Sequence, residues 1–327
     1  MWGLVWWRGW TALVCAASAA TAAAAPVAAV AWRAAAASGA ALEVYADDSY
    51  ALLAPGGAPW LASAPTAVHV GGAWFSSASA GWPSSVGAPL PLVRLGAGAS
   101  ADGGYEIRYS ANGSTPVTTS FALDAAAGAF VFSQSFPLGA TGVATLAPVN
   151  SSAGAGAGAG ALGEFASSTT PATQFPAFAQ AAGADAAGLG FASWAGRFFS
   201  SLGAGSGGAA AAFDAAAGGA EGGPIVLFAG GSGAAGSALV LSPLDNFKGT
   251  MLGRAASGAA GQAAAGVSGY ASSLPANFST STIALFGAAG VTDAVHAWGA
   301  ALLARHGGGA KVGDPTSTQL TYWTDSE

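Results

Sequence analysis

The chain has 327 residues, of which 52% are hydrophobic and only 7% carry a formal charge. Much of the hydrophobic share is alanine, which buries little apolar area, so a core must come from the 16 Phe, 11 Trp and 6 Tyr residues together with Leu and Val. The net charge is −6, and the nine basic residues are scattered singly rather than clustered, so we expect no nucleic-acid partner.

Residues 1–25 are predicted to be a secretory signal peptide. Arg8 precedes an apolar run from Trp10 to Ala20, and small residues with A-x-A cleavage patterns follow. The alternative is an uncleaved membrane anchor, because alanine-rich sequence continues to residue 41. Alanine inserts poorly into a bilayer and Arg33 interrupts the run, so we favour the signal peptide. The protein is then secreted, or held outside the cell or in its wall, with no stable membrane span after cleavage.

The only cysteine, Cys15, lies inside the predicted signal, so disulfides and thiol chemistry are excluded for the mature chain. A fold without disulfides must be held by its core, which favours a large sandwich over a small disulfide-rich module. Three N-x-[ST] acceptors fit a secretory route and are candidate N-glycosylation sites: Asn112, Asn150 and Asn277.

The chain from residue 42 to 290 is predicted to be an antiparallel β-sandwich. Short apolar or alternating runs are separated by Gly, Pro and Asp turns at intervals typical of a sandwich or barrel. The predicted strands cover residues 42–45, 50–53, 60–61, 68–70, 91–95, 105–110, 117–123, 129–136, 224–230 and 237–243. Two Gly/Ala-rich segments, 151–163 and 201–223, have few residues that could fill a core and are predicted to be surface insertions.

Residues 291–327 are predicted to be a linker helix followed by a new strand. The helix VTDAVHAWGAALLARHGGG has Thr292 or Asp293 as N-cap, a glycine stop at 307, and apolar residues at helical spacing, namely Val295, Trp298, Leu302 and Leu303. After a Pro-containing connector, LTYW is β-branched and aromatic, as in a strand. This order of elements is typical of a domain junction.

Motifs for catalysis or cofactors are weak in this chain. Gly231, Gly233 and Gly236 match G-x-G-x-x-G, but the following SALVLSP is a strand and not the helix that a dinucleotide site requires, so we predict a hairpin. The three histidines, His69, His296 and His306, are not spaced as metal ligands and are assigned to packing or surface. We therefore predict no cofactor and no metal.

Asp325 follows the predicted strand LTYW. Side chains at the carboxyl ends of strands form the active sites of (β/α)8 barrels, where an aspartate can bind ligand hydroxyls. Trp323 could stack on the apolar face of a sugar or pack inward with equal ease. The alternative for both residues is a frayed tail.

Several segments together support a family resemblance. They are GYEIRY (104–109), VFSQSFPLG (131–139), FPAF (175–178), GPIVLF (223–228), LVLSPLDNF (239–247), AWGAALL (297–303) and YWTD (322–325). Through them, residues 42–325 resemble the N-terminal region of the α-galactosidase and raffinose-synthase-like glycoside hydrolases, particularly uncharacterised secreted members from algae and oomycetes. Ser326 and Glu327 stand where that group has Asn and Gly, and the sequence then ends.

The resemblance implies a large, supersandwich-like β-domain, then the helix, then the first strand of a (β/α)8 barrel that is otherwise absent from this chain. In that group two carboxylates on later barrel strands perform α-glycoside hydrolysis or galactosyl transfer, so no catalytic residue is assigned here. Trp323 and Asp325 become candidate substrate-binding residues for an α-galactoside or related glycan. We expect a non-catalytic accessory sandwich that is inactive alone.

Two alternatives remain open at this point. The chain could be a stand-alone secreted carbohydrate-binding sandwich that uses exposed Trp side chains as stacking platforms, with Trp60, Trp74, Trp82 and Trp194 as candidates. It could also be a non-functional gene fragment whose helix and last strand expose apolar surface.

Overall fold

The computed structural model describes residues 28–79, 82, 88–145, 170–181, 188–195, 201–206, 223–229, 236–247, 249–256 and 261–307. Four predicted features lie outside these residues: the signal peptide, the 151–163 insertion, Asn150 and the strand with Trp323 and Asp325. The described part is mainly β, with one long helix, as the sequence predicted.

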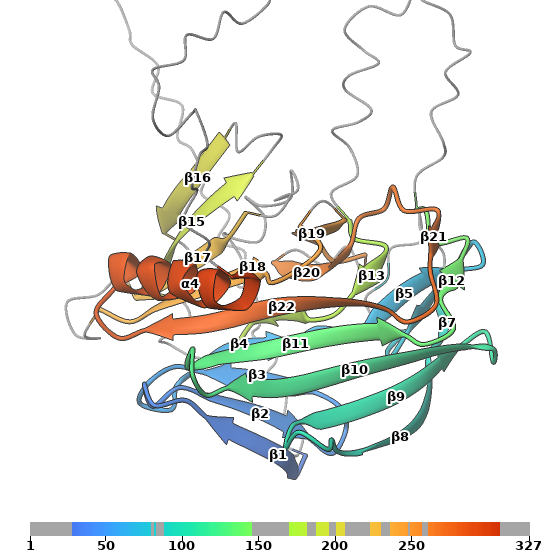
Figure 1. Cartoon of the computed structure of the whole chain (residues 1–327), viewed down its shortest axis with the longest axis horizontal. Coiled ribbons are helices and arrows are strands. Elements are labelled where there is room, and N and C mark those ends of the chain that lie inside the picture. The colour runs from blue at the N-terminus through green and yellow to red at the C-terminus, as the bar shows by residue number, and fades with distance from the viewer. Residues whose placement is uncertain are drawn as a thin grey trace, which may run out of the picture.

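Two large sheets form the body of the molecule (Figure 1). The seven-stranded sheet has the order β1 (Val30–Ala35), β2 (Ala41–Tyr45), β3 (Tyr50–Leu53), β4 (Pro59–Ser63), β14 (Ala177–Gln180), β20 (Gln262–Val267), β19 (Thr250–Arg254). The nine-stranded sheet has the order β16 (Ser201–Ser206), β15 (Leu189–Ala195), β17 (Ile225–Ala229), β18 (Ala238–Pro243), β22 (Phe278–Gly287), β11 (Ala129–Phe136), β10 (Thr115–Asp124), β9 (Tyr105–Ala111), β8 (Val93–Ala99).

Two small sheets complete the described strands. One contains β13 (Thr173–Gln174), β5 (Ala67–Val70), β6 (Ala73–Ser76) and β7 (Leu90–Pro91), and the other pairs β12 (Ala140–Thr141) with β21 (Ser273–Leu274). The β6–β7 pair is parallel, whereas both large sheets are antiparallel.

The two large sheets pack face to face around an aromatic core. In β11 the alternation of the sequence AFVFSQSF turns Phe130, Phe132 and Phe136 into the interior, where they are fully buried. Tyr50 of the seven-stranded sheet meets Phe121 and Phe132 of the nine-stranded sheet at ring-centroid distances of 5.2 and 5.8 Å. This contact across the layers confirms the predicted β-sandwich.

The predicted strands coincide with observed ones, but no strand was predicted over β6, β12–β15 or β19–β22, and there are two further differences. The first sheet begins at Val30 rather than residue 42, because β1 pairs with β2 along its length. The β1 sequence is alanine-rich and its faces are partly exposed, so it does not show the apolar–polar alternation that identifies a strand. In the second difference, β16 occupies the start of the 201–223 segment predicted as an insertion and pairs with β15.

The helix α4 (Val291–His306) lies on the outer face of the nine-stranded sheet, alongside β22 in Figure 1. Ala294 and Ala301 are buried against β17, β18 and β22. Of the predicted apolar face, Val295, Trp298 and Leu302 pack partly buried against the sheet, whereas Leu303 is 62% exposed. At 16 residues α4 is too short to cross a bilayer, and no helix in the described part has the length and apolarity that a membrane span needs.

The two ends of α4 differ in how well the sequence predicted them. Gly290, with φ 100°, is the N-cap, and not Thr292 or Asp293. Asp293 instead accepts a hydrogen bond from the Ala289 amide at 3.2 Å, which gives this backbone N–H a partner just before the helix. At the other end Gly307 adopts the left-handed conformation and its amide donates to Leu303 O, as the predicted glycine stop requires.

Candidate functional site

The predicted glycosylation acceptors that the structure describes lie at exposed turns. Asn112 is in the β9–β10 hairpin and Asn277 directly precedes β22. Both have positive φ, 55° and 61°, a backbone region that asparagine tolerates better than most residues. The third acceptor, Asn150, and both predicted sugar-binding residues, Trp323 and Asp325, are outside the described residues.

The tryptophans considered as stacking platforms do not form a flat exposed surface in the described part. Trp60 is only 3% exposed and packs edge-on against Phe286 at 5.5 Å, so its prediction as an exposed platform is wrong. Trp74 and Trp82 are half-buried and pack against each other at 5.5 Å with ring planes tilted by 55°. The side chain of Trp194 is not among those described.

The histidines have packing roles where the structure describes their contacts. The His69 ring packs on Trp74 at 5.2 Å, and its Nδ1 lies 3.0 Å from Val143 O. His306 Nε2 lies 2.7 Å from Leu244 O. Within the described ranges no group of three or more His, Cys, Asp or Glu side chains could hold a metal ion. The G-x-G-x-x-G segment joins β17 to its antiparallel neighbour β18, which confirms the predicted hairpin.

A polar pocket of about 390 Å³ opens where three sheets meet, at the β2–β3 turn, the ends of β4 and β6, the edge strand β8 and its neighbour β9. Its charged and phenolic groups are Asp47, Asp48, Arg94 and Tyr109. Its hydroxyl groups are Ser49, Ser63, Thr66 and Ser77, and its apolar lining is Ala64, Pro65, Ala78 and Leu92. This pocket is the candidate functional site.

A β-bulge in β8 directs Arg94 into the pocket. Arg94 lies opposite Tyr109 of β9, whereas Gly96 lies opposite Arg108, so Leu95 is an extra residue in β8. Tyr109 faces the interior and Arg108 faces solvent. In a regular strand residues 94 and 96 would share one face, and the bulge places them on opposite faces. Arg94 therefore lies on the same side of the sheet as Tyr109 and reaches the mouth of the pocket.

The β2–β3 turn supplies the acidic side of the pocket. Asp48 has φ 68°, which Asp accepts in tight turns, and its amide donates to Tyr45 O at 3.0 Å. Asp47 Oδ1 accepts from the Ser49 amide at 3.1 Å and from Ser49 Oγ at 2.6 Å, which fixes the direction of that carboxylate. The turn thus holds two adjacent carboxylates at the rim of the seven-stranded sheet.

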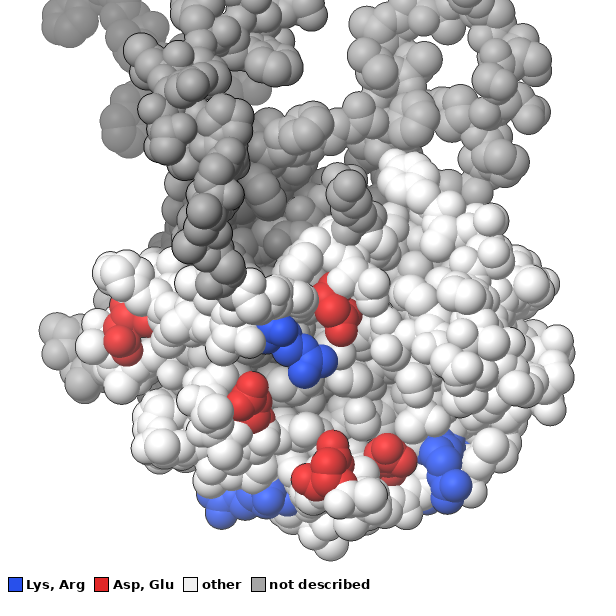
Figure 2. Space-filling model, viewed as in Figure 1, with Lys and Arg blue, Asp and Glu red and all other residues white. Residues whose placement is uncertain are grey.

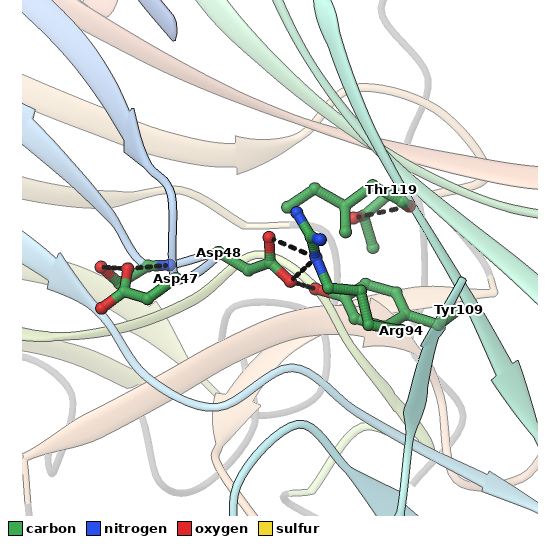
Figure 3. Close-up of polar contacts among 7 residues, drawn as sticks. Asp47, Asp48, Arg94, Tyr109 and Thr119 are labelled. Carbon is green, nitrogen blue, oxygen red and sulfur yellow. Dashed lines mark hydrogen bonds and ion pairs between the residues drawn. The ribbon is translucent and has the colours of Figure 1, made fainter. Parts of the chain in front are cut away.

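Arg94 and Asp48 form an ion pair that joins the two sheets (Figure 3). Arg94 Nε lies 3.0 Å from Asp48 Oδ1 and 2.7 Å from Oδ2. The hydrogen bond to Asp48 raises the pKa of Arg94, so the guanidinium stays charged. Its side chain is 46% exposed and that of Asp48 is 13% exposed, so the pair lies at the mouth of the pocket and is open to a ligand.

Tyr109 forms the inner wall of the pocket beside this ion pair. Its hydroxyl donates to Asp48 Oδ2 at 3.4 Å, and its ring is buried. Burial, and then the charge of Asp48, raise the pKa of Tyr109, so the phenol stays protonated at neutral pH and remains a donor. Thr119, also drawn in Figure 3, donates to Ile107 O at 3.4 Å and is buried in the sheet rather than in the pocket.

Two pocket hydroxyls are anchored by main-chain donors. Ser63 Oγ accepts from the Tyr50 amide at 3.0 Å, and Ser77 Oγ accepts from the Thr66 amide at 3.1 Å. Because each oxygen position is fixed by an accepted hydrogen bond, each O–H remains to be donated elsewhere. The site therefore combines carboxylate acceptors with guanidinium, phenol and hydroxyl donors around a small apolar lining, a composition suited to binding a polar small molecule.

No local sequence pattern predicted this site. The Asp residues between the predicted strands, Asp47 and Asp48 among them, were expected only to form turns, and Arg94 received no role. The available signal was a single Arg inside an otherwise apolar strand run, PLVRL. Comparison with protein-family models, curated proteins and solved structures gives no match for this chain.

Proposed function

We propose that this protein is a non-catalytic carbohydrate-binding β-sandwich of a secreted α-glycosidase-like enzyme, and that its polar pocket binds an α-galactoside or related glycan. The observation that carries the proposal is the pocket of about 390 Å³ with an Arg–Asp pair, a phenol and four hydroxyls. That volume falls in the range of about 300–1,000 Å³ typical of small-molecule sites.

The chemistry of the pocket suits a sugar. Sugar hydroxyls both donate and accept, and hydrogen bonds to charged groups are stronger than those between neutral groups. Asp48 and Asp47 can accept from ring hydroxyls, while Arg94 can donate to a hydroxyl or ring oxygen. Leu92 and Pro65 offer apolar contact for the C–H face of a sugar ring.

The attachment of α4 supports an accessory role for the sandwich. In the SPLDNF segment, Asp245 Oδ1 accepts from the Ser281 amide at 2.8 Å, and Asn246 Nδ2 donates to Ser279 O at 2.8 Å. Phe247 packs on the ring of His306 at 5.4 Å. The two hydrogen bonds anchor the SPLDNF segment on β22, and the Phe247–His306 contact holds the carboxyl end of α4 on that segment, as expected for a helix that passes on to a neighbouring domain.

The test is calorimetric titration of the full chain with methyl α-galactoside. We expect binding that weakens at least about tenfold, or about 1.4 kcal/mol, in Arg94→Met, because the substitution removes the guanidinium and leaves Asp48 without its cation. Arg33→Met is the matched control, since Arg33 forms a similar exposed ion pair with Glu43 at 3.3 Å outside the pocket.

Absence of binding by the unaltered chain contradicts the proposal, as does equal binding by the two variants. All twelve residues that line the pocket lie in this chain, so a stand-alone carbohydrate-binding sandwich would use the same site. Binding together with hydrolysis of a chromogenic α-galactoside by the chain alone would contradict the non-catalytic part of the proposal.

A further inference from the structure

We infer that the pocket selects sugars that carry a protonated amine over sugars that carry a carboxylate. This inference rests on the proposed function, because it concerns the ligand class of the same pocket. Its basis is the arrangement of three charged side chains at the mouth, which leaves one negative charge without a cation in the pocket.

The charged groups that line the pocket come from two elements. Asp47 and Asp48 belong to the β2–β3 turn, and Arg94 belongs to β8. The segments that follow β4 and β6 contribute only hydroxyl and apolar groups, and Tyr109 contributes a neutral phenol. The pocket therefore holds two carboxylates and one guanidinium.

Arg94 is already committed to Asp48. Its Nε lies within 3.0 Å of both Asp48 oxygens, so the two charges compensate each other. Asp47 belongs to neither of the ion pairs found in the described part of the chain, which join Arg33 to Glu43 and Arg94 to Asp48. Asp47 thus supplies the net negative charge of the pocket.

The Asp47 carboxylate is also held in a defined direction. Its Oδ1 accepts both hydrogen bonds from Ser49, and Ser49 itself lines the pocket. A fixed carboxylate binds a cation at a lower entropic cost than a freely rotating one. A ligand ammonium, with three N–H donors, could use Asp47 Oδ2 together with the pocket hydroxyls.

A ligand carboxylate would meet the opposite situation. The cation it would seek, Arg94, has Asp48 at 2.7 Å and Asp47 next in the chain. The ligand carboxylate would be repelled by these two aspartates, because at 0.1 M salt charges are screened only beyond a Debye length of about 10 Å. An exposed ion pair typically changes affinity by about two- to fivefold. Because the amine is attracted to the pocket and the carboxylate is repelled, we expect the amine sugar to bind at least about fivefold more tightly than the carboxylate sugar.

The test compares three sugars of one configuration on the full chain at pH 6 and low salt. They are methyl α-galactoside, its 2-amino-2-deoxy analogue and its 6-carboxylate. We expect the amine to bind most tightly, the neutral sugar next and the carboxylate least. The ratio of amine to carboxylate affinity should fall toward one in 1 M NaCl.

Two variants test whether the amine preference depends on the charge of Asp47 or on its role in the turn. Asp47→Asn keeps an oxygen that can accept from Ser49, so the turn is retained while the charge is lost, and the preference for the amine should disappear. Asp102→Asn is the matched control, because Asp102 accepts from Ser100 in a similar turn between β8 and β9 that does not line the pocket. It should leave the preference unchanged.

The outcomes distinguish this inference from the proposed function. If the neutral sugar binds and all three sugars bind within twofold of one another, the inference is overturned and the proposed function stands. An amine preference that survives in Asp47→Asn also overturns it. If none of the three sugars binds, the proposed function fails and the inference fails with it.

Discussion

Tyr50 joins the two layers of the sandwich through both its ring and its hydroxyl. The ring lies within 6 Å of four phenylalanines, namely Phe121, Phe132, Phe175 and Phe178. The hydroxyl donates to Ala177 O at 2.8 Å and accepts from the Ala177 amide at 2.7 Å. Burial raises the pKa of Tyr50, so the phenol keeps the proton that it donates.

Replacing Tyr50 with Phe should destabilise the fold because the Ala177 N–H loses its hydrogen-bond acceptor. Ala177 O keeps a second donor, the Ala64 amide at 2.8 Å, whereas the Ala177 N–H loses the phenol oxygen that accepts from it. A buried donor left without an acceptor costs about 1–3 kcal/mol, so the free energy of unfolding in urea should fall by that amount.

Tyr45→Phe is the control for this prediction. The Tyr45 hydroxyl also makes a hydrogen bond, to Glu43 at 2.9 Å, but the residue is half-exposed and water can replace the contact. We expect a change within about 0.5 kcal/mol, as for most surface substitutions. Equal losses in the two variants would mean that the Ala177 contact does not have the role assigned to it.

Among the elements, the contact between α4 and β22 depends on glycine. A Cβ added at Gly287 would lie 2.5 Å from Ala294 N and 2.7 Å from Ala294 Cβ, closer than packed atoms approach. Gly287 therefore allows the first turns of α4 to lie directly on the strand. This close approach lets α4 bury Ala294 and Ala301 against the sheet.

Two glycine substitutions should change stability in opposite directions. Gly287→Ala forces α4 away from β22, and overpacking of this kind costs about 1–3 kcal/mol. Gly299→Ala lies within α4 with open space around its Cβ and should stabilise the protein by up to about 1 kcal/mol through helix propensity. Urea titration followed by circular dichroism at 222 nm measures both, and a loss at residue 299 as large as that at 287 would contradict the packing argument.

At the scale of the whole molecule, charged side chains are sparse and of mixed sign on the face drawn in Figure 2. Solubility of such a surface can be increased by glycans, and the proposed secretory route would supply them. Asn112 and Asn277 are exposed in turns and are followed by the serines at positions 114 and 279 that complete the acceptor motif.

Expression through a eukaryotic secretory pathway should add a glycan at Asn112 and another at Asn277. Peptide mass spectrometry after release with a glycosidase that converts the modified Asn to Asp identifies each site. Ser114→Ala and Ser279→Ala should each remove one glycan while leaving the positive-φ asparagine in place. Secreted protein that lacks both glycans would contradict the prediction.

Much of the architecture followed from the order of residues. The alternation in AFVFSQSF and YEIRYS placed β11 and β9 correctly, and the glycine after His306 ended α4 at the predicted position. These features depend on neighbours two to four residues apart, so local sequence is sufficient to predict them. The strand β1 was missed because alanine gives no alternation for a periodic pattern to detect.

The sequence by itself determined that this chain forms an antiparallel sandwich followed by a helix, since side-chain periodicity decides which face each segment buries. Only the tertiary structure brought Asp48 to Arg94, 46 residues away, and to Tyr109, 61 residues away. That meeting depends on a bulge at Leu95 and on how the edges of the sheets align, and both are set by pairing between distant strands. For this reason a pocket that no local pattern predicted became the candidate site.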